Sequence, residues 1–209
     1  MAGKGLRTRR NITEQALQLF SLKGYYNTSI RDILEAASIT KGGLYGHFSS
    51  KEDIWYAVYD EAVRTWRDRI FSGTRDLSDP LERIEKVIEN HLIKYLAADV
   101  FIGGCFFVNM LVEISGQSEK MSRHILKGFV RFSRLIRLWF EEADQKKMVK
   151  DGLNFRDIAN FIIICMNGAA TIYSSSRDLG ILNQTLVQLR FYIGQLRIDN
   201  GKILTVPNI

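Results

Sequence analysis

The sequence contains little proline and little cysteine, with two residues of each among 209. Pro80 and Pro207 leave nearly the whole chain free to form helices, because proline is the residue that most disrupts a helix interior. Strictly alternating β-branched runs are absent, and so is a GxxxxGK phosphate loop. We therefore predict an all-α protein that is long enough to bury a proper hydrophobic core.

The scarcity of cysteine argues against a disulfide framework. Cys105 and Cys165 lie in apolar stretches, and we expect free thiols in a reducing compartment. The first ten residues are charged and lack the apolar core of a secretory signal. The most apolar segment, Ile158 to Tyr173, is interrupted by two asparagines and is shorter than the ~20 apolar residues of a membrane span. These features predict a cytoplasmic protein without a membrane partner.

Positive charge is concentrated near the N-terminus. Residues 1–51 hold eight basic and three acidic side chains, whereas the remaining 158 residues hold 21 basic and 20 acidic side chains. Concentrated positive charge favours binding to phosphate groups. A basic segment can also be merely solvated, so this signal depends on the helices around it.

The N-terminal quarter begins with the periodicity of two helices. Apolar residues at one-face spacing predict a first helix over about 7–23, closed by Gly24. Thr28 or Ser29 is expected to cap the second helix, because a hydroxyl there accepts from free backbone N–H groups. The same N–H groups would favour a phosphate at this helix start.

Two further helices follow a tight break. Thr40 is expected to cap a very short helix over 41–47. Ser49 and Ser50 stand at capping-box spacing before a longer helix that reaches about residue 71. Two short helices joined by a tight turn and backed by a third form a helix-turn-helix, whose second helix enters the DNA major groove.

Two segments carry a resemblance to a known family: TSIRDILEAA, which begins at Thr28, and ITKGGLYGHFSSKEDI, which begins at Ile39. Together they resemble the DNA-binding signature of the TetR family over about 50 residues. Ser38 stands where that family commonly has a turn glycine, so the turn either avoids a positive φ or places serine there. Gly43 stands where that family more usually has a small hydroxyl residue or alanine, which removes one possible contact with a DNA base or phosphate.

The resemblance implies that Tyr45, His47 and Lys51 hold DNA phosphates. Tyr45 could instead be a packing residue, and the N-terminal arginines could contribute only screened attraction. His47 has no partner at metal-ligand spacing, so no metal is expected. The expected DNA contacts are Arg7, Arg10, Thr28, Ser29, Arg31, Thr40, Lys41, Gly42, Gly43, Tyr45, His47 and Lys51.

The remaining chain contains the pattern of five more helices, which brings the total to about nine. We expect a helix-turn-helix domain over 1–52 and a larger helical effector-binding and dimerisation domain over 53–209. The five helices are predicted over about 80–98, 103–115, 118–145, 154–176 and 181–198.

The last of these helices carries apolar residues at alternating spacings of four and three, the pattern of a coiled-coil seam. With the preceding helix it could form a four-helix bundle with a second subunit. The alternative is that the seam packs within its own domain. The expected dimer contacts are Phe161, Ala169, Leu182, Leu186, Leu189, Ile193 and Leu196.

The middle helices carry more aromatic residues than a small core usually needs. His91, Asn109 and Glu113 are isolated polar groups among them, and each alone is typical of a structural group. As a set they suggest a ligand pocket. The expected pocket residues are His91, Tyr95, Cys105, Phe106, Asn109, Met110, Glu113, Phe129, Phe132 and Cys165, although Cys165 by itself is typical of a structural thiol.

The Gly104-Cys105 pair is similar to the TetR subgroup that includes electrophile-responsive repressors of reductase genes. That resemblance implies a sensor thiol at Cys105, and a helix start near Gly103 would lower the pKa of that thiol. The alternative is that Cys105 is a small buried side chain.

Taken together, the sequence predicts a homodimeric transcription regulator on a palindromic operator, with recognition helices about 34–36 Å apart. A small apolar or electrophilic effector of unknown identity would release it; repression is favoured over activation. An all-α enzyme is the alternative, but the three histidines are scattered and no cofactor is expected. A helical adaptor would leave the segment from Thr28 to Asp53 without a role.

Overall fold

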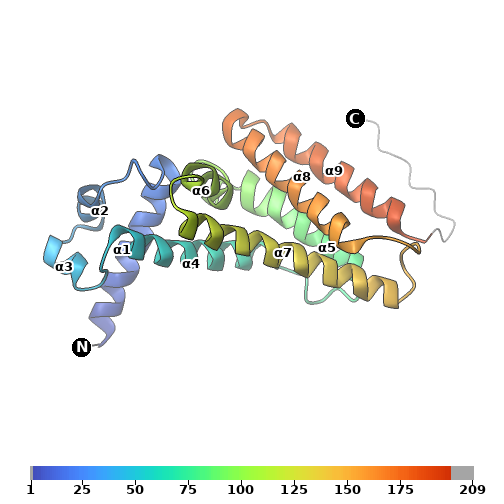
Figure 1. Cartoon of the computed structure of the whole chain (residues 1–209), viewed down its shortest axis with the longest axis horizontal. Helices are drawn as coiled ribbons and strands as arrows, with labels where there is room; N and C mark the ends of the chain where they lie inside the picture. The colour runs from blue at the N-terminus through green and yellow to red at the C-terminus, as the bar shows by residue number, and fades with distance from the viewer. Residues whose placement is uncertain (1, 199–209) are drawn as a thin grey trace.

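The computed structural model describes residues 2–198, and helices joined by turns make up its regular secondary structure (Figure 1). Val149 and Arg197 form one isolated bridge, and no strand occurs in that range. The predicted all-α class is therefore confirmed. The part of the expected C-terminal domain beyond residue 198 lies outside the described residues. The helices are α1 (Ala2–Lys23), α2 (Ile30–Ala37), α3 (Lys41–Tyr45), α4 (Lys51–Ile70), α5 (Pro80–Glu89), η1 (Asn90–Ala97), α6 (Phe106–Ile114), α7 (Glu119–Gln145), α8 (Phe155–Ser176) and α9 (Leu179–Leu196).

Short-range capping explains where most of these helices begin. The Ser29 hydroxyl accepts from the backbone N–H of Asp32, and the Asp32 carboxylate accepts from the Ser29 N–H in return. Thr40 and Ser50 cap α3 and α4 by the same kind of bond. Each cap satisfies a backbone donor that the helix itself cannot.

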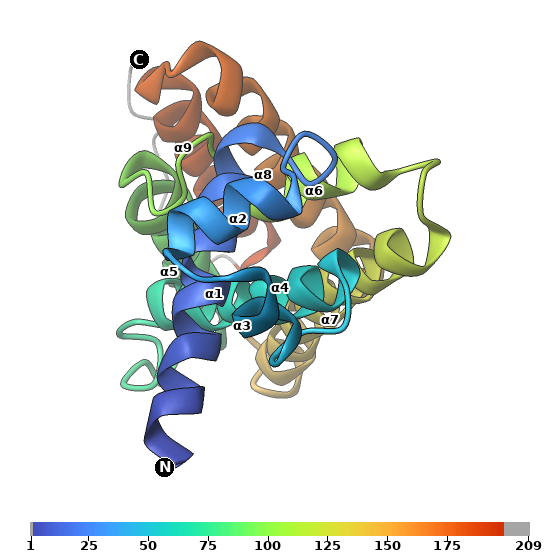
Figure 2. The ribbon, with the colours of Figure 1, turned by 90° about the vertical axis from the view of Figure 1, so that its left-hand side faces the viewer.

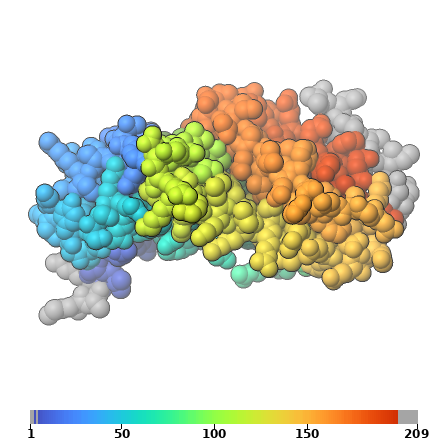
Figure 3. Space-filling model, in the orientation of Figure 1, coloured from blue at the N-terminus to red at the C-terminus, as the bar shows by residue number. Residues whose placement is uncertain are grey.

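The molecule is elongated, with α1–α3 at one end (Figure 1). Helix α4 leaves this end and runs beneath α6 toward the body, where α7 lies along it. Helices α8 and α9 form a further layer on α5, η1 and α7. In the space-filling view the N-terminal helices abut the segment around α6 and the start of α7 (Figure 3).

A small apolar core holds the N-terminal helices together. Ile12 and Phe20 of α1, Ile33 of α2 and Leu44 of α3 are fully buried. Phe48, just after α3, is also buried. Burial of each such side chain contributes roughly 1.5–3 kcal/mol, which fixes α3 relative to α1 although α3 has little more than one turn.

The predicted helix over 80–98 changes character at Asn90, where the chain widens into the π-helical segment η1. The Asn90 side chain is fully buried and donates to the carbonyls of Ile70 and Ser72, at 2.9 and 2.8 Å. These bonds satisfy backbone acceptors at the end of α4, and they tie η1 to it. Segments of π-helix occur frequently at functional sites.

Helix α8 is long and apolar enough to cross a membrane by length and composition alone. Its inward face, including Ile162, Met166 and Ala170, belongs to the buried core. A core helix of a folded domain passes the same test, so this property is weak support for a membrane span.

The predicted seam on α9 packs inside the protomer and is not a surface. Its five residues have exposed fractions of 0–9%, as does Ala169 on α8 at 5%. The assignment of these residues to a dimer contact is therefore wrong, because their side chains fill the core beneath α8 and α9. The residues concerned are Ala169, Leu182, Leu186, Leu189, Ile193 and Leu196.

Candidate functional site

The short helix α3 is presented at the end of the molecule, next to α2 (Figure 2). Thr40, Lys41 and Gly42 are exposed, and the Tyr45 side chain is 46% exposed. A Cβ atom added at Gly42 would meet nothing within 4 Å, so no protein contact requires glycine there. This surface is open to a large partner such as a nucleic acid duplex.

Arg9, which the list of expected contacts omitted, anchors α3 from beneath. Its guanidinium lies over the Phe48 ring at 4.1 Å and donates to the His47 carbonyl at 2.7 Å. The side chain of His47 is half-buried beside it. In the sequence, Arg7, Arg9 and Arg10 indicate only a positive charge. Nothing in that pattern predicts that Arg9 packs on an aromatic ring.

Several other expected contacts have partners within the protein. Arg10 pairs with Glu14 and Arg31 with Glu35, each at 2.7 Å on an exposed helix face. Such exposed pairs contribute about 1 kcal/mol or less, so the arginines can exchange these partners for phosphates. Arg7 is exposed and Ser29 caps α2, also at the surface.

Thr28 does not reach the surface. It is fully buried, and its hydroxyl donates to the Gly24 carbonyl at 2.7 Å. The cap of α2 is Ser29 alone. The expectation of a phosphate contact at Thr28 is therefore wrong, because the hydroxyl closes the turn after α1.

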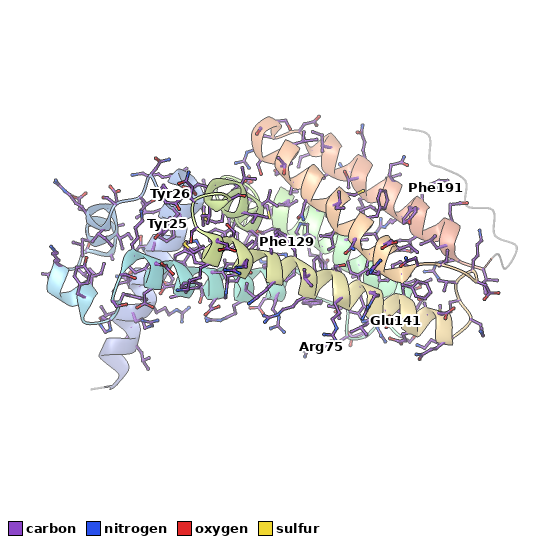
Figure 4. All side chains as sticks on the ribbon, viewed as in Figure 1. Tyr25, Tyr26, Arg75, Phe129, Glu141 and Phe191 are labelled. Carbon is purple, nitrogen blue, oxygen red and sulfur yellow. The ribbon has the colours of Figure 1, made fainter. Side chains whose placement is uncertain are left out.

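Glu113 joins α6 to the turn after α1. Its carboxylate accepts from the backbone N–H groups of Tyr25 and Tyr26, both at 2.8 Å. Gly24 has a φ of +86°, and a Cβ atom there would lie within 3 Å of this carboxylate. Figure 4 shows the two tyrosines at this junction. The expected ligand role of Glu113 is wrong, because both carboxylate oxygens bind the helix-turn-helix end.

Lys51 lies at the same junction. Its ammonium is 4.3 Å from the centre of the Tyr25 ring, and burial lowers the pKa of Lys51 while the Glu113 charge opposes that effect. The side chain is half-buried at the start of α4. Lys51 is thus held in place on an aromatic face near the expected DNA surface.

A cavity of about 370 Å³ lies inside the helical body. Its walls come mainly from α4 and α7, with contributions from η1, α6 and α8. Four of the expected pocket residues line it: His91, Cys105, Phe129 and Phe132. Figure 4 places Phe129 near the middle of the molecule on α7. The other aromatic walls are Tyr59, Trp66, Phe71 and Phe107. Phe107 belongs to the aromatic residues of the middle helices that suggested a pocket, whereas Tyr59, Trp66 and Phe71 were not identified from the sequence.

His91 is the most deeply buried polar group on this wall, with 5% of it exposed. Trp66 Nε1 donates to His91 Nδ1 at 3.1 Å. Burial lowers the pKa of His91 to about 3, so the imidazole is neutral at physiological pH. Its Nε2 has no hydrogen-bond partner among the described residues.

The remaining expected pocket residues lie outside the cavity wall. Asn109 donates to the Gly103 carbonyl at 2.8 Å, so its amide closes a turn. Tyr95, Phe106 and Met110 are buried core residues, and Cys165 is half-buried on α8. None of them lines this cavity, whose walls are built by other helix faces, so their ligand contacts stay a prediction.

Cys105 lines the cavity but does not have an activated thiol. It is 1% exposed, and burial raises its pKa more than nearby backbone N–H groups lower it. Helix α6 begins at Phe106, because Gly103 and Gly104 both have a φ of +99°. The expectation of a lowered thiol pKa is thus wrong, and its alternative of a small buried side chain agrees with the geometry.

Comparisons with known proteins agree with this architecture. A sequence model described as bacterial regulatory proteins of the tetR family matches residues 12–58, and one described as a tetracyclin repressor-like C-terminal domain matches residues 80–186. The transcriptional repressor DhaR of Mycobacterium sp. (strain GP1) is 28% identical over 181 residues, 85% of this chain and 88% of its own. An uncharacterised regulator of Lactococcus lactis is 27% identical over 185 residues, 88% and 91% of the two chains.

The crystal structure of a TetR regulator from Chloroflexus aurantiacus superposes with a TM-score of 0.87 at 26% identity. The match covers 94% of this chain and 99% of that one. Both parts of the chain, the exposed helix-turn-helix and the helical body, therefore have counterparts in one family. The chain belongs to the TetR family and is a DNA-binding transcriptional regulator.

Proposed function

We propose that the protein is a repressor that binds a palindromic operator as a homodimer and leaves it when a small molecule fills the internal cavity. The observation that carries this proposal is the exposure of α3 at the end of the molecule, on a capped and well-packed helix-turn-helix. Lys41 and Tyr45 face DNA, while Gly42 lets the backbone approach it closely. The division between DNA-binding and effector-binding parts falls at about residue 52.

The dimer contact uses the outer face of α8 in place of the buried seam. Phe161, Ile164 and Ile172 are 46%, 67% and 55% exposed and lie on one side of that helix, with the exposed Gly168 between them. Leu179 at the start of α9 is 52% exposed. An exposed apolar stripe on two neighbouring helices suits a four-helix bundle across a two-fold axis.

Release operates through two connections between the cavity and the DNA end. Helix α4 begins beside the helix-turn-helix and contributes Tyr59, Val63 and Trp66 to the cavity wall. Helix α6 holds the turn after α1 through Glu113. An effector that binds better when these helices are displaced selects a state in which the two recognition helices no longer fit successive major grooves.

This proposal gives the protein a binding role in the cytoplasm and no reaction of its own. A gel-shift selection from random duplexes tests it. We expect saturable enrichment of a palindrome whose half-sites are about one helical turn apart, with affinity that falls steeply with salt. Absence of retention at low salt would contradict the proposal, and so would retention without any sequence preference.

A further inference from the structure

The protonation of His91 is fixed by its neighbour. A neutral imidazole carries one N–H and one free lone pair, and the Trp66 indole N–H occupies the lone pair on Nδ1. The proton therefore lies on Nε2. Since His91 stays neutral in its buried site, this nitrogen is a hydrogen-bond donor and not an acceptor.

The Nε2 donor has no partner among the described residues, and His91 lines the cavity, although the Nε2 atom itself is covered by neighbouring protein atoms. An acceptor therefore reaches it when the side chains of the wall shift on binding. Leaving a buried donor unpaired is unfavourable, so a ligand gains affinity by supplying an acceptor. A carbonyl or ether oxygen fits this requirement. An ammonium group does not, because it can only donate hydrogen and no lone pair remains on His91 to accept it.

The exposed part of the cavity lining carries charged side chains, in contrast to the neutral donor of His91. Arg67 on α4 and Arg131 on α7 are exposed lining residues, and neither forms an ion pair within residues 2–198. Asp60 is the one carboxylate among the lining residues described. Burial lowers the pKa of His124, which lines the same cavity, so this ring adds no charge at neutral pH. The rim therefore carries a net positive charge that attracts an anion.

Much of the remaining wall is aromatic. Trp66 packs edge-on against both Phe107 and Phe132, with ring centres 5.9 and 5.0 Å apart. Rings in this arrangement present faces and edges to a flat guest. The volume of about 370 Å³ suits a molecule of one to three rings.

We propose that the effector is an aromatic carboxylate that also carries a separate oxygen acceptor. The acceptor binds His91 Nε2–H, the rings fill the space around Trp66, and the carboxylate lies at Arg67 and Arg131. The role of this ligand as an effector rests on the proposed release function. The binding preference depends only on the residues that line the cavity.

Calorimetry on the full chain without DNA tests the chemistry with defined probes. We use 6-acetyl-2-naphthoate and 4′-acetylbiphenyl-4-carboxylate, which differ in length. Their partners are the isopropyl analogues, which lack the acceptor, and the aminomethyl analogues, which replace the anion by a cation. We expect the acetyl carboxylates to bind about fivefold more tightly than the isopropyl ones and at least about tenfold more tightly than the cations. Equal binding within either pair, or no binding of either acetyl probe, would overturn the inference.

Two variants assign the preferences to residues. His91→Phe should reduce the acetyl preference to about one while leaving the isopropyl affinity nearly unchanged. Arg67→Gln with Arg131→Gln should weaken all carboxylates about fivefold and reduce the penalty on the cations. Should His91→Phe fail to fold, nitrogen NMR of the unaltered protein gives the tautomer directly; a proton on Nδ1 would contradict the proposed donor.

The failure of this inference is distinguishable from the failure of the proposed function. Probes that bind in the expected order without lowering operator affinity would refute release while supporting the ligand class. Release of DNA by a neutral or cationic compound that binds this cavity, with the carboxylate probes inactive, would refute the ligand class while supporting release.

Discussion

Ser38 lies in the left-handed region, with a φ of 52° and a ψ of 48°, at the C-terminal end of α2. The turn therefore does not avoid a positive φ; it places serine in that conformation where the family commonly has glycine. The left-handed conformation costs a non-glycine residue roughly 1–2 kcal/mol. Glycine would avoid this cost, but it loses more backbone entropy on folding, so the net gain from glycine is smaller. The helix-turn-helix thus carries a small strain at its turn.

Replacing this residue measures that strain. We expect Ser38→Gly to raise the free energy of unfolding by about 0.5–1 kcal/mol in urea titrations. Ser38→Ala is the matched control and should leave stability nearly unchanged, because the exposed side chain retains a Cβ atom in both cases. A destabilised glycine variant would contradict a left-handed Ser38.

Burial of His91 makes the stability of the protein depend on pH. The pKa of His91 is about 3 in the folded protein, against an ordinary value of 6.5. Below pH 6.5 the unfolded chain binds a proton that the folded chain refuses, so stability falls as the pH falls from about 6.5 toward 3.

We expect the His91 contribution to reduce the free energy of unfolding by roughly 2 kcal/mol between pH 7 and pH 5. Urea midpoints of the unaltered protein and of His91→Phe, each measured across this range, check the value. The variant should have the shallower acid dependence. Identical pH dependence in both proteins would mean that His91 titrates normally.

At the scale of helices, Glu113 is the group that connects the effector-binding body to the DNA end. A glutamine there has only one acceptor oxygen, and its NH₂ group would face a backbone N–H. We expect Glu113→Gln to lower the free energy of unfolding by about 1–2 kcal/mol and to weaken effector-induced release while operator binding persists.

Thermal unfolding and DNA anisotropy with and without effector measure both effects. Glu119→Gln is the control, since Glu119 is 79% exposed and its one ion pair within residues 2–198 is with Arg123 on the same helix. Release that remains as efficient as in the unaltered protein would exclude Glu113 as a connection.

The positions of most helices could be predicted, because their caps and periodicities are local. Ser29, Thr40 and Asp79 each satisfy a helix start within three residues of themselves. The cavity could not be predicted in the same way, because its walls depend on which face of α7 meets α4. Tyr59, Val63 and Trp66 share a spacing of four and three on α4, a signal that could have indicated this wall.

The α9 seam shows the corresponding limit for surfaces. Spacings of four and three identify a buried face but not the partner that buries it. In this fold α8, α5 and η1 bury the seam within the protomer. The π-helical widening at Asn90 left no signal, because it depends on acceptors at the end of α4.

At the scale of the whole molecule, the exposed stripe on α8 predicts the assembly state. Ile164 is 67% exposed, so Ile164→Asp should leave the protomer folded but place an unpaired carboxylate in the dimer contact. We expect the dimer dissociation constant to rise by at least about 100-fold. Sedimentation velocity over a concentration series measures it.

Val130→Asp is the matched control, because Val130 is also 67% exposed but lies on α7, off the stripe. It should leave the dimer unchanged. If both variants dimerise normally, the contact lies on another surface.

The most direct test of DNA recognition by α3 is an anisotropy titration of the selected operator with Lys41→Ala/Tyr45→Ala. Both side chains are exposed, so the thermal unfolding midpoint should match that of the unaltered protein. We expect operator affinity to fall about 100-fold, since each lost contact costs roughly 1–2 kcal/mol. Unchanged affinity in a folded variant would show that this helix does not bind the operator.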